Sequence, residues 1–130
     1  MEQSTTGPLD RISDLIGINL YGCGQDWDLT CADPERVEEF CDIYECESLS
    51  DFDKRELMRL IVASYDDAIC IGMPSEQIWQ RVRRLLEAEF TIHEEIVEYW
   101  SLPKESDSNN VFPITLLMRE IWSRFNKSEI

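Results

Sequence analysis

The sequence has little from which a catalytic centre could be built. His93 is its only histidine, so mechanisms that need two imidazoles are excluded. The segment that begins there, His-Glu-Glu-Ile-Val-Glu, lacks the second histidine of a zinc-protease helix. Gly22-Cys23-Gly24 lacks the downstream glycine, lysine and serine or threonine of a phosphate-binding loop. We therefore expect no enzyme and no cofactor, and we expect His93 to be exposed or to cap a helix.

Long apolar runs and large basic clusters are also missing. No stretch approaches the roughly 20 consecutive apolar residues that cross a bilayer, and residues 1–8 have no basic cluster followed by an apolar run. We therefore expect a cytoplasmic protein without a membrane segment. Arg81, Arg83 and Arg84 form a small basic patch, but glutamates bracket it and the net charge is −15. Direct contact with nucleic acid is not expected.

Cysteine spacing gives no sign of a metal site or a disulfide framework. The five cysteines, an odd number, stand at positions 23, 31, 41, 46 and 70 without any C-x-x-C pair. A zinc site that combines the first four with His93 would lack the short, regular ligand spacing of known motifs. We therefore expect structural or bystander thiols and no bound metal.

The chain does have helical periodicity along most of its length, although the aromatic segment between Gly17 and Ala32, which contains Tyr21 and Trp27, is predicted to be irregular. Leu9–Gly17 has the pattern of a short amphipathic helix, and Asp33-Pro34, Ser50, Pro74-Ser75, Thr91 and Pro113 each carry residues typical of a helix start. Leu57–Tyr65 is apolar almost all round, as is typical of a helix in the middle of a domain. The sequence therefore predicts an all-α fold of five to six helices around a central apolar helix.

The length of the chain and the placing of its loop residues predict one domain. A chain of 130 residues can bury a core of its own without disulfide bonds or a metal ion. We place the compact helical domain at residues 9–126, between a flexible N-terminus at 1–8 and a frayed C-terminus at 127–130. The polar segment at 103–111 is predicted to be a mobile loop.

Negative charge is concentrated in one part of the chain. Residues 26–53 carry eleven carboxylates against one cation, Arg36, which gives this segment −10 of the total charge of −15. A concentrated negative field attracts basic partners and repels nucleic acid and anionic membranes. The pattern therefore indicates a binding function rather than a catalytic one.

The expected binding surface combines aromatic and acidic residues. On the predicted helix after Asp33, an apolar stripe faces the core, while carboxylates with unfavourable like-charge spacing occupy the opposite face. The preceding Gln25-Asp26-Trp27-Asp28 adds an aromatic anchor beside unpaired charges. The expected partner-binding residues are Tyr21, Asp26, Trp27, Asp28, Glu35, Glu38, Glu39, Asp42 and Glu45.

Several stretches resemble one known class of protein. These are Gln25–Asp28, Ala32–Arg36, Leu57–Asp67, Glu98–Leu102 and Pro113–Ile121. Together, across residues 18–122, they resemble the small acidic helical immunity proteins of bacterial contact-dependent or polymorphic toxin systems. The resemblance implies an inhibitor that occludes a basic cognate toxin, often a nuclease domain. It also implies that carboxylates of Glu35, Glu38, Glu39 and Asp42 replace nucleic-acid phosphates in the toxin's cleft, while Trp27 and Tyr21 pack against its rim.

Three alternatives stay open on the sequence. The chain could mimic nucleic acid toward a restriction or CRISPR nuclease, which would use the same electrostatics on another target. It could be an acidic helical scaffold or adaptor in which Arg81, Arg83 and Arg84 of one subunit meet the acidic helix of another, so the oligomeric state is open. The acidic segment could also be only a solvated face.

Overall fold

Residues 7–126 are the part of the chain that the computed structural model describes, and they contain helices but no strands. The elements are α1 (Asp10–Ile16), the 3₁₀ turn η1 (Leu20–Cys23), α2 (Trp27–Thr30), α3 (Val37–Cys46), α4 (Asp51–Cys70), α5 (Glu76–Ala88), α6 (Phe90–Ser101), the 3₁₀ turn η2 (Ser108–Asn110) and α7 (Thr115–Asn126). The prediction of an all-α single domain is confirmed for these residues. They hold seven α-helices rather than five or six, because α2 lies in a segment predicted to be irregular.

The two ends of the chain are described only in part. The segments predicted to be flexible or frayed, 1–8 and 127–130, lie outside the described residues except for Gly7 and Pro8. The Gly7 N–H donates a hydrogen bond to Asp10 Oδ2 at 2.7 Å. The adjoining Leu9 N–H donates to the Tyr21 hydroxyl at 2.6 Å, so this stretch is fixed to η1.

Two helices begin where the sequence predicted, because a serine caps each of them. Ser50 Oγ accepts the Asp53 N–H at 3.1 Å at the start of α4. Ser75 Oγ accepts the Ile78 N–H at 3.3 Å at the start of α5. Each hydroxyl satisfies one of the backbone donors that have no partner within the first turn.

Two other predicted helix starts are wrong. Asp33 closes a turn by accepting the Glu35 N–H at 3.0 Å, and α3 begins only at Val37. Thr91 lies inside α6, because the break between α5 and α6 falls at Glu89, whose φ of −129° and ψ of 48° are not helical.

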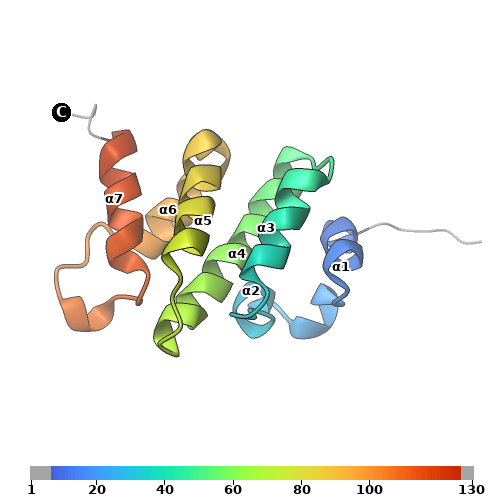
Figure 1. The fold of residues 1–130 in the computed structure, drawn as a ribbon, viewed down its shortest axis with the longest axis horizontal. Coiled ribbons are helices and arrows are strands. Elements are labelled where there is room, and N and C mark those ends of the chain that lie inside the picture. The colour runs from blue at the N-terminus through green and yellow to red at the C-terminus, as the bar shows by residue number, and fades with distance from the viewer. Residues whose placement is uncertain (1–6, 127–130) are drawn as a thin grey trace, which may run out of the picture.

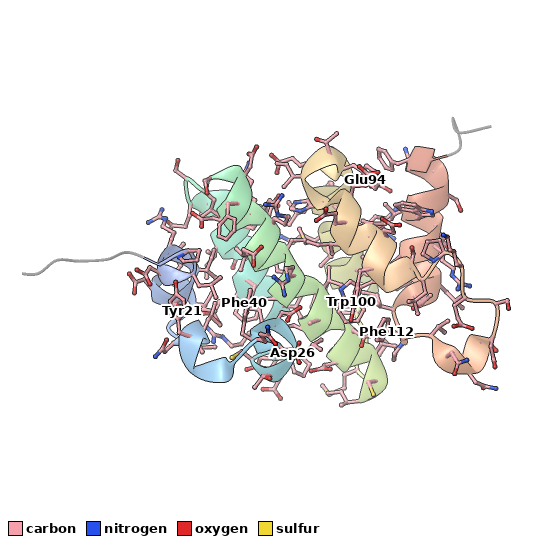
Figure 2. The ribbon with its side chains drawn as sticks, turned by 180° about the vertical axis from the view of Figure 1, so that it is seen from behind. Tyr21, Asp26, Phe40, Glu94, Trp100 and Phe112 are labelled. Carbon is pink, nitrogen blue, oxygen red and sulfur yellow. The ribbon has the colours of Figure 1, made fainter. Side chains whose placement is uncertain are left out.

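Helix α4 packs against most of the other helices, and half of its residues are buried. Every residue from Leu57 to Tyr65 except Arg59 is buried, and α4 contacts α1, α2, α3, α5 and α6. Helices α3 and α5 lie in front of α4 in Figure 1. Figure 2 shows the molecule from behind, and there α4 and α6 are nearest to the viewer. Helix α7 packs on α6, at the opposite end of the long axis from α1 (Figure 1). These helices therefore form two layers, one of α3 and α5 and the other of α4 and α6 (Figures 1 and 2).

Arg119 and Asp66 anchor the segment between α6 and α7. Arg119 donates hydrogen bonds to the carbonyl oxygens of Ser101 at 2.7 Å, Leu102 at 3.0 Å and Glu105 at 2.7 Å. Asp66 Oδ1 accepts the Ile114 N–H at 2.9 Å, just before α7 begins. The loop predicted to be mobile is thus tied to α7 near its start and to α4 just beyond its end.

Truncation of a core residue on α4 tests this packing. We expect Leu60→Ala to lower the free energy of unfolding by about 2 to 5 kcal/mol, because it leaves a cavity at a fully buried site. Leu116→Ala is the matched control, since Leu116 is 68% exposed on α7, and it should change stability by less than about 0.5 kcal/mol. Urea denaturation measures both, and equal effects would contradict the arrangement.

Candidate functional site

The nine residues predicted to bind a partner do not form one surface. Helix α3, with its carboxylates, shares one side of α4 with α5. Asp26 and Asp28, by contrast, line a groove between α2, α4 and α6 on the other side. The structure therefore places eight of the predicted residues in two sets, and Tyr21 lies apart in η1. The α3 set is Glu35, Glu38, Glu39, Asp42 and Glu45, and the α2 set is Asp26, Trp27 and Asp28.

Cations of this chain neutralise part of the α3 set. Arg81 of α5 reaches Asp42 Oδ1 at 2.7 Å and Glu45 Oε1 at 2.5 Å through one guanidinium nitrogen. Arg36 forms a two-point ion pair with Glu39, with Nε–Oε1 at 2.8 Å and Nη2–Oε2 at 2.7 Å. Arg81 of the small basic patch therefore pairs within the chain, and so does Arg83, with Glu87 at 2.9 Å. Such exposed pairs stabilise a fold by only about 0–1 kcal/mol each.

Glu35 and Glu38 are the free members of the α3 set. Both side chains are exposed at the N-terminal end of α3, and neither forms an ion pair within residues 7–126. Glu35 precedes the helix rather than lying on it, so the predicted repulsion between Glu35 and Glu39 at helical spacing does not occur. These two residues leave unneutralised negative charge on this face.

Trp27 was predicted to be a surface anchor, and that prediction is wrong. Its side chain is only 5% exposed, because the short helix α2 packs its ring toward α4. The guanidinium of Arg59 lies over this ring, 5.1 Å from its centroid, and pairs with Asp28 at 3.4 Å. Tyr21 keeps an exposed ring, but its hydroxyl is used in fixing Leu9.

The groove beside Asp26 and Asp28 has a volume of about 370 Å³, and α6 forms its far wall. A second hollow of about 580 Å³ lies along α6 and shares Glu95 and Tyr99 with the first. Tyr99 is 55% exposed. Tyr99 was not among the predicted binding residues, although an aromatic residue outside the apolar face of α6 was a usable signal.

His93 is fully buried, so the prediction of an exposed or capping histidine is wrong. Its Nε2 lies 2.7 Å from the Tyr44 hydroxyl, which donates its hydrogen to Glu89 Oε1 at 2.7 Å. Lys54 Nζ binds the other oxygen of Glu89 at 2.7 Å. Because Tyr44 has one hydrogen to give, Nε2 of His93 carries the proton of that ring. Nδ1 then has no hydrogen-bond partner among the described residues.

The electrostatics of this network are set by burial. Desolvation lowers the pKa of His93 to about 4, so the ring is neutral at pH 7. The hydrogen bond from Lys54, followed by that from Tyr44, lowers the pKa of Glu89. A sealed, neutral histidine beside a tyrosine and an ionised glutamate holds α3, α4 and α6 together. The His93 ring is not exposed at the surface.

The cysteines follow the prediction in part. Cys41, Cys46 and Cys70 are free, and burial raises the pKa of the Cys41 thiol to about 12, which makes it unreactive. Cys31 is disulfide-bonded, so the expectation of a free thiol is wrong there. Across residues 7–126 no three histidine, cysteine or acidic side chains gather where they could hold a metal ion. No helix in this range has the length and apolar character needed to cross a membrane.

Comparison of the chain with protein-family models, with curated proteins and with solved structures finds no match. Functional interpretation therefore depends on the residues and geometry described above.

Acid should destabilise the protein through His93. The unfolded chain binds a proton at the ordinary pKa of 6.5, whereas the folded state does so only near 4. Between these values the unfolded state holds more protons, so stability falls as the pH falls from 6.5 to 4, by about 3 kcal/mol in total. Urea denaturation at several pH values should show this loss.

His93→Gln is the matched control for this effect. Glutamine can still donate to Tyr44 but does not titrate, so its stability should depend less on pH between 6.5 and 4. Burial raises the pKa of Asp66 and Asp67, which acts in the opposite direction, but both proteins contain them. Identical pH dependence of the two proteins would contradict the assignment of the effect to His93.

Proposed function

We propose that this chain is a non-catalytic cytoplasmic inhibitor that binds a basic cognate toxin and neutralises it. We propose further that the toxin is a nuclease domain, which would place the chain among the immunity proteins that its sequence resembles. Neither a bound metal nor a cofactor has a part in this function.

The observation that supports the proposal is the number of carboxylates without a cation. Of the eleven carboxylates between residues 26 and 53, five form ion pairs with described residues and six do not. The six are Asp26, Asp33, Glu35, Glu38, Asp51 and Asp53. Like charges without counterions repel each other, and a basic partner would remove that repulsion.

A nuclease fits this surface because it must hold a phosphate backbone in a cationic cleft. In the proposed complex, Glu35 and Glu38 occupy the centre of that cleft. Asp42 and Glu45 lie at its edge, where Arg81 already holds them. Long-range attraction would raise the association rate toward about 10⁸ M⁻¹s⁻¹ at low salt, and added salt would reduce it. Fast association suits an inhibitor that must act before the toxin does.

The first experiment is capture of the partner. The tagged wild-type chain is incubated with extract of the source cells at low salt and eluted with a salt gradient, and bound proteins are identified by mass spectrometry. We expect one basic protein with nuclease activity that the chain inhibits at equimolar concentration. Recovery of the chain alone would contradict the proposal.

Charge reversal then tests the α3 surface. We expect Glu35→Lys/Glu38→Lys to weaken binding of the captured toxin by about 100-fold or more, since two attractive contacts become repulsive. Calorimetry and a nuclease-inhibition assay measure this. Asp42 is left unchanged, because its replacement would also break the ion pair with Arg81.

The matched control carries the same change of charge on other helices. Glu94→Lys/Glu120→Lys alters two exposed glutamates of α6 and α7, of which Glu120 forms only a long ion pair of 4.0 Å with Arg83. This variant should weaken binding by less than about threefold at physiological salt. Both double variants should unfold within about 1 kcal/mol of the wild type. Full inhibition by Glu35→Lys/Glu38→Lys would rule out the α3 surface as the inhibitory contact.

A further inference from the structure

We infer that the face formed by α2 and α6 around Tyr99 is a second docking surface, and that its occupant is a basic polypeptide segment. An arginine or lysine of that segment packs on the Tyr99 ring and pairs with the neighbouring carboxylates. This inference rests on the proposed function, because it concerns how a basic partner is held.

The shape of this face supports a docked segment. The hollows of about 370 Å³ and 580 Å³ lie side by side, and Tyr99 forms the ridge between them. The ring is held in place by an edge contact with Trp100, at 5.5 Å between centroids, and by stacking on Phe112 at 5.8 Å. Figure 2 shows Trp100 and Phe112 close together at the end of α6. A rigid, half-exposed aromatic ring loses little entropy on binding, as is typical of interface anchors.

The charge around Tyr99 selects a basic occupant. Asp28 and Glu56 are already paired with Arg59. Asp26, Glu95, Glu98 and Glu105 line the two hollows without an ion pair in the described part of the chain, against the free cations Arg55 and Lys104. Unpaired carboxylates thus outnumber unpaired cations, which favours a positively charged segment and opposes an anionic ligand.

The groove itself contains the geometry that we propose for the contact. Arg59 lies over the Trp27 ring at 5.1 Å and pairs with Asp28 at 3.4 Å, so one guanidinium contacts a ring and a carboxylate together. Tyr99 and Glu95 offer the same combination one helical turn apart on α6. Within residues 7–126 no cation lies over the Tyr99 ring. The partner would supply that cation.

The opposite wall of the groove suits the aliphatic part of such a side chain. Leu29 of α2 is exposed on that wall. Ile96 of α6 lines the groove on the same side as Tyr99. Arginine and lysine have apolar stems that pack on such residues while their charged ends stay near carboxylates. The face therefore matches both ends of a long basic side chain.

The test uses a defined peptide and the full chain. The probe is a fluorescein-labelled peptide of alternating arginine and alanine, about twelve residues long, followed by fluorescence anisotropy at physiological salt. We expect Tyr99→Ala to raise the Kd at least about tenfold and Tyr99→Phe to leave it within about threefold, because the ring rather than the hydroxyl makes the contact. Tyr99→Phe also controls for folding, which circular dichroism checks for each variant.

Two charge-matched pairs locate the peptide. Glu95→Gln/Glu98→Gln should raise the Kd about tenfold or more, whereas Glu76→Gln/Glu120→Gln removes the same charge from exposed glutamates that line neither hollow and should change it less than about threefold. Glu35→Gln/Glu38→Gln is measured as well, because that surface also attracts basic segments. Equal effects of the first two pairs, an unchanged Kd for Tyr99→Ala, or no binding by the wild type would each overturn the inference.

The outcomes also separate this inference from the proposed function. If the Kd of the peptide depends on Glu35 and Glu38 alone, the inference of a docking surface at Tyr99 is wrong, but the proposed inhibitor function is not affected. If the Kd of the peptide depends on Tyr99 but no inhibited toxin is captured from the source cells, the docking surface is supported and the proposed function is contradicted.

Discussion

The carboxylate of Glu89 fixes the arrangement of the helices around α4. It is the single residue between α5 and α6, and it accepts hydrogen bonds from Lys54 of α4 and Tyr44 of α3. Tyr44 also binds His93, so the start of α6 is tied to α3 as well. The network holds the chain at the break between α5, which packs beside α3 in the front layer of Figure 1, and α6, which packs beside α4 in the layer behind. The network is not complete, because His93 Nδ1 has no hydrogen-bond partner among the described residues, but Lys54, Tyr44 and Glu89 each bind another member.

This arrangement explains why the acidity does not form one continuous patch. Helix α3 and helix α2 present their carboxylates on different sides of α4, and each side has its own arginine. Arg81 neutralises Asp42 and Glu45 on the first side, and Arg59 neutralises Asp28 on the second. What remains is two smaller regions of free charge. A basic partner with a cleft can contact one region, and both contribute to the field that attracts it from a distance.

How much could be predicted depended on whether the determining contact was local. Ser50 and Ser75 cap their own helices, so their sequence motifs were sufficient. The break at Glu89 depends on Lys54, which is 35 positions away, and no neighbouring residue reveals it. Burial of Trp27 likewise depends on packing against α4. His93 was misjudged because its acidic neighbours suggested exposure, although its spacing from Ile96, Val97 and Trp100 placed it on the apolar face.

The excess of acidic over basic residues, 27 against 12, does not by itself decide which carboxylates are free. Arg55, Arg84 and Lys104 form no ion pair with any residue from 7 to 126, yet none of them reaches Glu35 or Glu38. A fold selected for stability alone would gain a little by placing these charges together. Their separation leaves one surface deficient in positive charge while positive charge remains unused elsewhere. Such a distribution contributes little to folding, but it increases the attraction toward a basic partner, and this favours binding as the reason for the acidic segment.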